Sequence, residues 1–501
     1  MSAAGGLLAV RRAGVLLHPS SLPSPYGDGD LGHAAYRFVE FLQAAGFSVW
    51  QTLPLGPTHE DRSPYNALSV HAGNPRLISV DWLYDRGLLD RAHLDSLVRE
   101  PGDRDAVLAS AAARFATRTA TDPVLAGRYH EYCAAHAHWL EPYARFVALR
   151  EAHGGHPWHQ WPRALRDRSP DALRGASAAM QTRLAALRFE QFVFAEQWQA
   201  LREYARARGV YLFGDVPIFV AHDSADVWGS RNLFRLDADG MPTVVTGVPP
   251  DYFSAQGQRW GNPHYDWAAM AGDGFDWWRR RIASARERFD LVRIDHFRGF
   301  EACWEVPRDA PDAVTGAWAR APGEAVLGAL VEHSGAGTLV AENLGIITPE
   351  VEKLRHAYGL PGMLILQFAF DGDCANPYLP HNHEAFNVVY TGTHDNDTTR
   401  GWFKSLDADT RDRVLDYLGL PGERMPWPLI RSALCSVACL AILPLQDLLE
   451  LDSSHRMNRP GIADGNWRWQ FRDGHLDAAL AVRVRALLDR YGRLAVVPVP
   501  G

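Results

Sequence analysis

The sequence predicts an α/β protein whose core is a (β/α)8 TIM barrel, interrupted by inserted subdomains of which one is mostly helical. Short apolar runs alternate with segments of helical periodicity along most of the 501 residues, which is typical of a parallel sheet with helical crossovers. Polar residues, several of them acids, come directly after the apolar runs, as they do at the catalytic face of such a barrel. Apolar residues make up 47% of the chain, which is enough for a large core.

The first repeat of the pattern lies near the N-terminus. Residues 14–17 form a short apolar run, residues 31–45 repeat phenylalanine and leucine at helical spacing, and residues 47–55 form a second apolar run. Gly46, between the last two, is a typical helix stop. This order predicts a strand, a helix and a second strand.

Two regions depart from the alternation. Between about residues 88 and 187, Ala, Arg, Leu and His dominate and strand-like runs are few, so we expect an inserted, mostly helical subdomain. A second inserted region, about 222–270, is expected to form a lid-type loop. Because no low-complexity linker or internal repeat is evident, residues 1–501 are interpreted as a single catalytic barrel that carries both insertions.

Further strand and helix repeats follow, and each predicted strand ends near a polar residue. The predicted helices span 191–208, 275–288 and 325–333. The predicted strands, with the polar residues after them, are 210–213 with Asp215, 291–294 with Asp295, 338–341 with Glu342, 387–390 with His394 and Asp395, and 440–443 with Gln446 and Asp447. Strand ends of a barrel meet at one face, so these side chains are expected to lie close together.

Charge and cysteine content narrow the class of protein. There are 51 Lys and Arg against 59 Asp and Glu, a net charge of −8, so no basic field is present to attract nucleic acid. The five cysteines are irregularly spaced, which favours free thiols in a reducing compartment over a disulfide framework. The N-terminus lacks the charge order of a signal peptide, and the longest later apolar run, 437–445, is too short to span a bilayer. We expect a cytoplasmic monomer or weak homodimer without membrane contact.

Three potential metal ligands lie close together in the sequence. His130, Cys133 and His136 stand at helical spacing within the expected helical insertion. They could hold zinc, but no fourth ligand stands at a settled spacing, so ordinary helix residues are the preferred interpretation. No metal is expected.

The acids at the strand ends suit retaining chemistry at a glycosidic bond. Such a reaction uses one carboxylate as the nucleophile and a second carboxyl group as general acid and then base, about 5–5.5 Å apart. Asp295 and Glu342 follow neighbouring predicted strands and are predicted to form this pair.

The surroundings of each acid favour a different role. Strand alternation puts Arg293 and Asp295 on the same face, where the guanidinium would favour the ionised form that a nucleophile requires. An ordinary Arg–Asp ion pair would explain this motif equally well. Glu342 ends an apolar strand, so burial should raise its pKa, which suits a general acid. The alternative for Glu342 is an acid at a helix N-terminus.

Two further acids extend the pattern. Residues 391–397 hold His394 and Asp395 among short polar residues, which form either a capped turn or a site for the hydroxyl groups of a distorted sugar. Asp215 is the fourth acid at a strand end. Each acid alone is a weak signal, but four in the same topological position together indicate a sugar site.

With these residues placed, the sequence closely resembles the 4-α-glucanotransferases of glycoside hydrolase family seventy-seven, within the α-amylase superfamily. The resemblance covers nearly the whole chain. It rests on the motifs GVLLHPSSLP at 14–23, SPY at 63–65, AGNP at 72–75, GDVPI at 214–218, GVPPDYF at 247–253, GQRWGNP at 257–263, MNRPG at 457–461 and GNW at 465–467.

The resemblance implies roles for individual residues. Asp295 would be the nucleophile, Glu342 the acid/base and Asp395 a stabiliser of the transition state. The residues that would surround the reacting glucose are Tyr65, Asp215, Arg293 and His394. Donor-side contacts would come from Ser63, Trp260 and Asn466, and acceptor-side contacts from Asp251, Gln258 and the backbone near Gly345. Asn343 follows Glu342 where some members carry an acid, a difference that could shift the pKa of Glu342.

The resemblance also implies the reaction. An α-1,4-glucan segment would pass from a maltooligosaccharide, starch or glycogen donor to the 4-hydroxyl of glucose or another glucan, without a metal or organic cofactor. A mainly hydrolytic α-amylase-type glycosidase and a non-catalytic glucan-binding protein are the alternatives. The loop 247–263, with Tyr252, Phe253 and Trp260, either packs against the body of the protein or closes as a lid that excludes water. A lid would favour transfer over hydrolysis.

Overall fold

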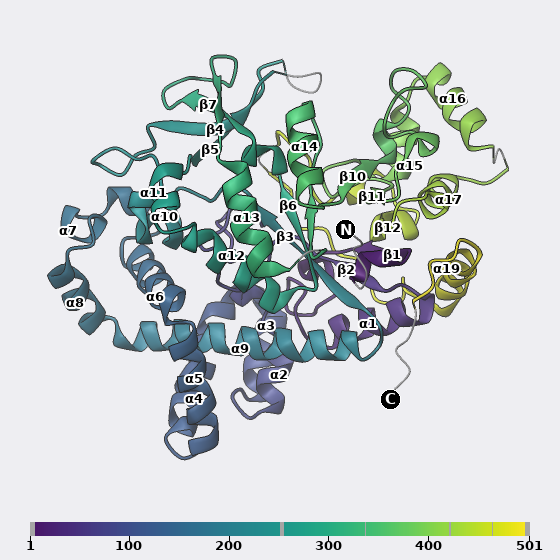
Figure 1. Ribbon diagram of the computed structural model, residues 1–501. Coiled ribbons are helices and arrows are strands. Elements are labelled where there is room, and N and C mark those ends of the chain that lie inside the picture. The colour runs from purple at the N-terminus through teal and green to yellow at the C-terminus, as the bar shows by residue number, and fades with distance from the viewer. Residues whose placement is uncertain (1–5, 251–254, 336, 420–421, 463, 496–501) are drawn as a thin grey trace.

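The computed structural model describes residues 6–250, 255–335, 337–419, 422–462 and 464–495. At its centre lies an eight-stranded parallel barrel with the strand order β10-β11-β12-β1-β2-β3-β6-β9 (Figure 1). The strands are β1 (Arg12–Leu16), β2 (Val49–Gln51), β3 (Tyr211–Pro217), β6 (Leu291–Asp295), β9 (Leu339–Ala341), β10 (Gly362–Ile365), β11 (Asn387–Tyr390) and β12 (Leu440–Pro444). The predicted (β/α)8 fold is confirmed.

The barrel closes where the ends of this strand order meet. The Ala341 N–H at the end of β9 donates to the Pro361 carbonyl, directly before β10, at 2.8 Å. The first strand lies between β2 and β12, and Gly14 pairs with both Val49 and Ile442. A Cβ at Gly14 would lie 2.6 Å from the Val49 carbonyl oxygen, so glycine is needed for this close approach.

Helices cover the outside of the barrel. The main ones are α1 (His33–Ala45), α12 (Asp276–Arg288), α13 (Gly323–Ser334), α14 (Pro349–Ala357), α15 (Thr399–Ser405), α16 (Ala408–Leu418), α17 (Trp427–Cys435), α18 (Leu445–Leu448) and α19 (Ala478–Arg490). As predicted, α1 ends at Gly46, whose φ of 86° is left-handed and whose N–H bonds to the Gln43 and Leu42 carbonyls. No helix within the described ranges is long and apolar enough to cross a membrane.

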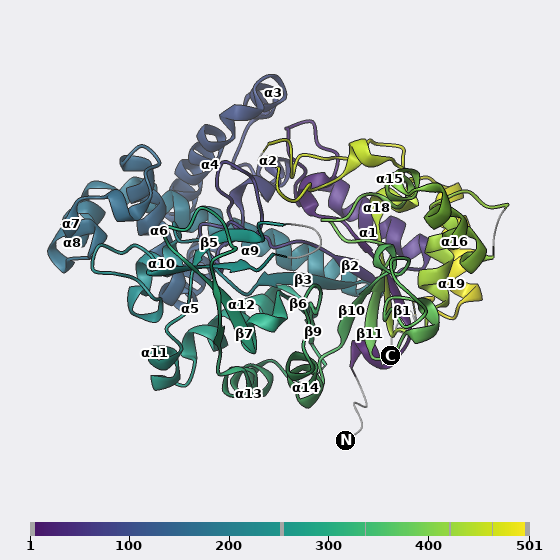
Figure 2. The ribbon, with the colours of Figure 1, turned by 90° about the horizontal axis from the view of Figure 1, so that it is seen from above.

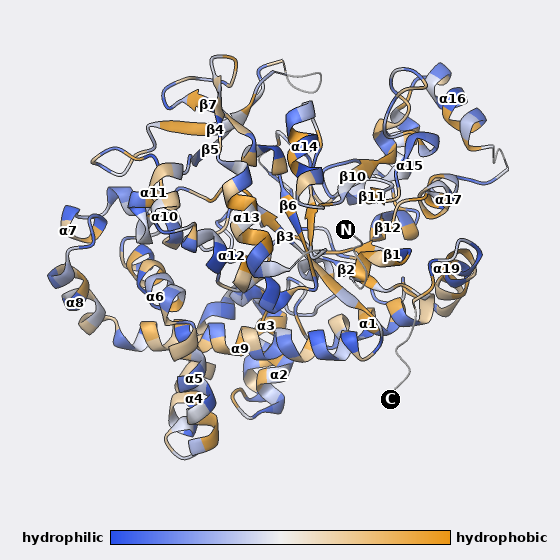
Figure 3. Cartoon of the chain, viewed as in Figure 1, coloured by the Kyte–Doolittle hydropathy of each residue, from blue (hydrophilic) through white to orange (hydrophobic). Residues whose placement is uncertain are grey.

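Alternate residues of the barrel strands face two different apolar cores. On β6, Val292 and Ile294 pack outward in the large cluster shared with the helices, whereas Leu291 belongs to the cluster inside the barrel. Figure 3 shows the strands as mainly hydrophobic and the helices as two-sided. Arg293 and Asp295 share the inward face of Leu291, so strand alternation carries both toward the mouth of the barrel, as the sequence predicts.

The chain between β2 and β3 is helical. Its helices are α2 (Val80–Asp85), α3 (Arg91–Arg99), α4 (Arg104–Thr119), α5 (Pro123–Ala135), α6 (Ala137–Ala152), α7 (Arg163–Arg166), α8 (Pro170–Ala179) and α9 (Gln181–Arg206). In the two views of Figures 1 and 2, α7 and α8 lie at the end of the molecule opposite α19.

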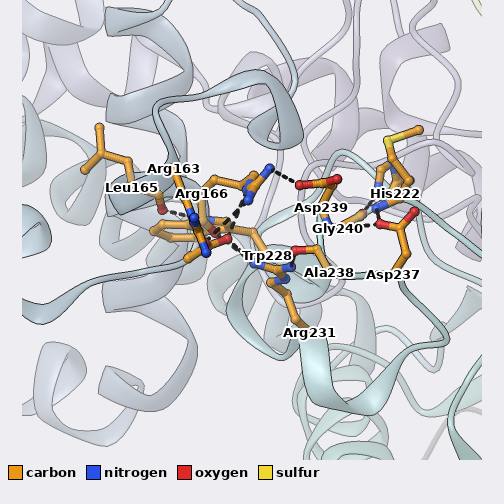
Figure 4. Close-up of polar contacts among 12 residues, drawn as sticks. Arg163, Leu165, Arg166, His222, Trp228, Arg231, Asp237, Ala238, Asp239 and Gly240 are labelled. Atoms are coloured by element: carbon orange, nitrogen blue, oxygen red, sulfur yellow. Dashed lines mark hydrogen bonds and ion pairs between the residues drawn. The ribbon is translucent and has the colours of Figure 1, made fainter.

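A polar network joins α7 to the segment that follows β3 (Figure 4). Arg166 donates to Asp239 at 2.9 Å, and Arg231 donates to Asp167 at 2.7 Å. The Trp228 indole, from α10 (Ala225–Gly229), donates to a carbonyl of α7. These bonds attach the helical region to the segment that leads into a second sheet.

The second sheet is antiparallel and has the strand order β5-β4-β7-β8. Its strands are β4 (Val244–Val248), β5 (Gln258–Pro263), β7 (Ala302–Pro307) and β8 (Ala317–Arg320), and α11 (Trp267–Gly272) follows β5. Part of the span 222–270 therefore pairs with strands that come after Asp295. An ion pair of 2.8 Å between Asp237 and Arg308 ties the loop of Figure 4 to this sheet.

One barrel strand has no counterpart among the predicted elements. Strand β10 has four residues, and a 3-10 helix, Leu366–Phe368, follows it at once. No acid marks its end, unlike the ends of β3, β6, β9, β11 and β12, and Gln367 is the first polar residue after it. The predicted strand at 47–55 is also longer than the observed β2, Val49–Gln51.

A buried arginine joins the two ends of the described chain. Arg493 is 0% exposed, and its guanidinium donates to the carbonyls of Arg12, Leu434, Ser436 and Ala438 at 2.7–2.9 Å. Burial, with the nearby charge of Arg11 in second place, lowers the pKa of Arg493 to about 9. The residue thus fixes the segment after α19 against β1 and against the turn that leads into β12.

Candidate active site

Asp295 stands at the C-terminal end of β6, beside a buried guanidinium. Arg293 is 5% exposed and donates from Nη2 to Asp295 Oδ1 at 2.6 Å and from Nη1 to Asp215 Oδ2 at 2.5 Å. Burial alone would lower the pKa of Arg293, but the two carboxylates raise it well above its usual value. One fixed positive charge therefore serves two strand-end acids.

Asp215 lies deeper in the barrel than Asp295. It is 4% exposed, and it also accepts a hydrogen bond from the Tyr65 hydroxyl at 2.7 Å. Burial raises the pKa of Asp215, while Arg293 and the Tyr65 hydroxyl oppose that rise. Asp215 therefore contacts both Arg293 and Tyr65, whereas Asp295 is the more exposed of the two acids.

Glu342 follows β9, the strand next to β6, and two backbone amides hold its carboxyl group. The His296 N–H donates to Oε2 at 2.6 Å, and the Leu344 N–H donates to Oε1 at 2.8 Å. Because His296 directly follows Asp295, the first bond brings the two acids into one site. As the sequence predicts, burial raises the pKa of Glu342, to about 7, and the charge of Asp295 adds to that rise.

Asp395 lies beyond β11 and is held by a distant loop. Its Oδ1 accepts from Asn458 Nδ2 at 2.6 Å, its carbonyl accepts from Arg456 at 2.8 Å, and His394 Nε2 lies 3.3 Å from Oδ2. The surrounding protein desolvates Asp395 and so would raise its pKa, but His394 and Asn458 outweigh this and lower it to about 2. Asp395 is thus ionised at any working pH, although 48% of its side chain is exposed.

An aromatic wall stands beside these acids. The Tyr65 and His394 rings are stacked with centroids 5.1 Å apart, and Trp467 lies within 6.0 Å of both. A hollow of about 460 Å³ has His394 in its lining, and another of about 590 Å³ is lined in part by Tyr65 and Asp215. The stacked pair therefore separates two open spaces.

The second sheet brings an exposed indole toward the same region. Trp260 of β5 is 39% exposed, and its ring meets the imidazole of His296 edge-on at 4.8 Å. Its indole N–H donates to the side chain of Gln258 at 3.1 Å. This bond couples the Gln258 amide to the exposed Trp260 ring, next to His296, the residue that follows Asp295.

The other predicted contacts are less tightly placed. Ser63 lies in the loop that leads to Tyr65, and Gly345 is exposed in the loop after Glu342 with a φ of 81°. The side-chain amide of Asn466 is engaged inside its own loop, where it bonds to the backbone of Arg459 and Ile462. Three predicted residues, Asp251, Tyr252 and Phe253, lie outside the described residues.

Asp447 has the same sequence signal as the site acids but a different environment. It is 1% exposed and accepts hydrogen bonds from both side chains of Thr391 and Thr399 and from the Thr399 N–H. These bonds join α18, which follows β12 directly, to the loop after β11 and to the first residue of α15. The position of Asp447 is therefore that of an internal tie.

Sequence reasoning missed the residues that position the acids. Asn458 belongs to the motif at 457–461 and Arg456 directly precedes it, but nothing there indicates that they contact Asp395. The His296 amide reaches Glu342 because its residue has a left-handed φ of 51°, which no side-chain pattern predicts. Within the described ranges, no group of three or more His, Cys, Asp or Glu side chains is arranged to hold a metal ion.

Comparison with known proteins supplies the family. A family model described as 4-alpha-glucanotransferase, Glyco_hydro_77, matches residues 17–476. The chain is 47% identical over 499 residues to a 4-alpha-glucanotransferase of Thermus thermophilus, with 97% of this chain and 99% of that protein covered. It is 42% identical to a chloroplastic/amyloplastic 4-alpha-glucanotransferase of Arabidopsis thaliana, with 97% and 86% covered. The structure of an amylomaltase from Streptococcus agalactiae in complex with acarbose superimposes with a TM-score of 0.93 at 34% identity, over 97% of this chain and 100% of that one. The chain therefore belongs to the 4-alpha-glucanotransferase family, glycoside hydrolase family 77.

Proposed function

We propose that this 4-α-glucanotransferase works by a retaining double displacement in which Asp295 is the nucleophile and Glu342 the acid/base. The observation that carries this proposal is the hydrogen bond from the His296 N–H to Glu342, which joins two carboxyl groups in opposite settings. Asp295 is ion-paired and partly exposed, whereas Glu342 is buried and keeps its proton to about pH 7. A nucleophile and a general acid need these two different states.

In the first step, Asp295 attacks the anomeric carbon of an α-1,4-linked glucose. Glu342 gives its proton to the departing glycosidic oxygen, so the leaving chain departs with a free 4-hydroxyl and a β-linked glycosyl-enzyme forms. In the second step, the Glu342 carboxylate removes the proton from the 4-hydroxyl of an incoming glucose or glucan. That oxygen attacks the anomeric carbon, Asp295 leaves, and an α-1,4 bond is restored.

Asp395 and its neighbours are proposed to bind the reacting glucose. The ionised carboxylate of Asp395 accepts hydrogen bonds from sugar hydroxyls, and His394 beside it donates one. Such bonds lower the barrier when they tighten as the ring flattens in the transition state. Tyr65, stacked on His394 at 5.1 Å, offers its ring to the apolar face of the same sugar.

The region 222–270 is proposed to cover the donor sugars as a lid. The exposed indole of Trp260, close to His296, supports this proposal because sugar faces stack on such rings. A covered glycosyl-enzyme meets less water, so a glucan hydroxyl competes better as the acceptor. Ser63, Asn466, Asp251, Gln258 and the Gly345 backbone remain proposed sugar contacts of the donor and acceptor sides.

Maltooligosaccharides, starch or glycogen chains and free glucose are the proposed substrates, in maltose or storage-glucan metabolism. The proposed chemistry needs no metal or organic cofactor, because two carboxyl groups carry all the proton and bond changes. All five cysteines are free, which supports action in a reducing compartment such as the bacterial cytoplasm. The plant relative, by its name, is chloroplastic/amyloplastic.

The test uses maltotriose, with oligosaccharides, free glucose and total reducing ends measured in the same samples. Transfer gives a ladder of longer and shorter products with a constant number of reducing ends, whereas hydrolysis raises that number. Asp295→Asn should abolish the ladder while far-UV circular dichroism stays unchanged. A folded D295N protein that still makes the ladder would overturn the assignment of the nucleophile.

A further inference from the structure

The seam of the barrel lies beside the proposed general acid. Strands β9 and β10 lie at the two ends of the strand order, and the Ala341 N–H to Pro361 carbonyl bond brings them together. Beyond this bond the chain of β9 continues into Glu342 and Asn343. At that level the contact between the two strands is made by a side chain.

That side chain is Asn343. Its Oδ1 accepts a hydrogen bond from the Met363 N–H of β10 at 2.8 Å. Oδ1 thus takes the place of a backbone carbonyl of β9 at the seam. Gly362 leaves the space for it, since a Cβ on Gly362 would lie 2.8 Å from both polar atoms of the amide.

The other end of the amide reaches a helix. Asn343 Nδ2 donates to Glu352 Oε1 at 2.8 Å, and Arg355 holds Glu352 Oε2 through Nε and Nη2 at 3.0 and 2.6 Å. Both of these residues lie on α14, which packs outside the seam. Asn343 therefore joins β9, β10 and α14 at one point, immediately next to Glu342 in the chain.

We propose that Asn343 is a positioning residue that fixes the orientation of the Glu342 carboxyl group. The backbone of Glu342 is already bonded to the β6 side, through Ile294 and Phe297 at 3.0 and 3.1 Å. The peptide that follows Asn343 supplies the Leu344 N–H that holds Glu342 Oε1 at 2.8 Å. If the Asn343 amide did not anchor this peptide, the Leu344 N–H could turn away and free one oxygen of the acid.

This inference rests on the proposed acid/base role of Glu342. The charged and titratable groups that face Glu342 are Asp295 and Arg293 from β6, and Tyr378 from the loop before β11. The Leu344 and His296 amides lower the pKa of Glu342, against the rise from burial and from Asp295. Without the Leu344 hydrogen bond, the Glu342 carboxyl group would lose its fixed orientation and one of the interactions that lower its pKa.

Asn343→Ala is the first test, with glucose release from maltotriose as the assay. We expect kcat to fall about 10- to 100-fold, the size of effect that a misplaced catalytic group produces, with KM within about threefold of wild type. The matched control is Asn74→Ala, because Asn74 is a buried asparagine whose Oδ1 likewise accepts a backbone N–H, that of Arg76. A kcat for N343A within twofold of that of N74A would overturn the proposal.

Two further variants separate orientation from stability. N343D keeps the acceptor for the Met363 N–H but faces Glu352 with a second carboxylate. Because a like charge comes near Glu342, the pH above which kcat/KM falls should rise by about one unit. The swapped variant N343D/E352Q restores an amide–carboxylate pair in reverse, and its kcat should recover to within about fivefold of wild type. A swapped variant no more active than N343A would refute the positioning role.

Failure of the underlying role is distinguishable from failure of this inference. Glu342→Gln should abolish the ladder from maltotriose whatever the role of Asn343. An active E342Q protein would overturn the acid/base assignment itself. An inactive E342Q beside an unimpaired N343A would leave that assignment standing and remove only Asn343.

Discussion

The bond from Asn458 to Asp395 gives a prediction whose size follows from the structure. Asn458→Ala removes a 2.6 Å hydrogen bond to a carboxylate. Bonds to charged groups contribute about 1.5–3 kcal/mol. Because 48% of the Asp395 side chain is exposed and water replaces part of the bond, we take about half of that value, roughly 0.75–1.5 kcal/mol. Each 1.4 kcal/mol is a factor of ten, so kcat/KM should fall about 4- to 13-fold.

The assay is kcat/KM for glucose release from maltotriose, below the substrate concentration at which the rate saturates. Asn382→Ala is the control, because its exposed amide bridges the Cys374 and Asn376 carbonyls at 2.9 Å, outside the site. N382A should keep the wild-type value. If N458A also stays within twofold of wild type, Asp395 does not depend on this bond and the reasoning is wrong.

Three more predictions test the site and the fold. The pKa of Glu342 is raised to about 7, so its proton is retained up to that pH, and kcat/KM should be level below pH 7 and fall above it in a profile measured from pH 5 to 9. Tyr65→Phe removes the hydroxyl that bonds to Asp215 at 2.7 Å and should lower kcat about tenfold; a kcat equal to wild type would exclude a role for this bond. Arg493→Met leaves four carbonyls without their donor, so the free energy of unfolding measured in urea should fall by about 3–5 kcal/mol. A fall below about 1 kcal/mol would contradict the contribution assigned to this residue.

Most of the barrel could be predicted because short apolar runs alternate with helical periodicity and an acid lies at or near the end of five of the strands. Strand β10 ends without an acid, and the second sheet pairs β4 with β7, far apart in the chain, so neither left a local pattern. The apolar run at 47–55 also led to a predicted strand that is too long. Strand β2 ends at Gln51, but the side chains of residues 52–55 stay buried, so the apolar pattern continues beyond the strand. Pairing of distant short strands depends on tertiary packing, which periodicity does not encode.

In the site, strand alternation was enough to put Arg293 beside Asp295, and burial at a strand end was enough to predict a raised pKa for Glu342. The partners that hold the acids could not be predicted in this way. Asn458 is 63 residues from Asp395, and Met363 is 20 from Asn343. Asp447 shows the reverse case, since its position after a strand matches that of Asp295 and Glu342, and two threonines turn it into an internal tie.

The arginine that joins the chain ends also has a consequence for synthesis on the ribosome. Strand β1 is made well before its neighbour β12 and the guanidinium of Arg493, which follow it by more than 400 residues. Until then one edge of β1 has no ladder partner, and an unpaired edge is a template for association with other chains. The nascent protein therefore cannot hide this edge before β12 and Arg493 have been made, so the growing chain stays open to association with other chains during synthesis.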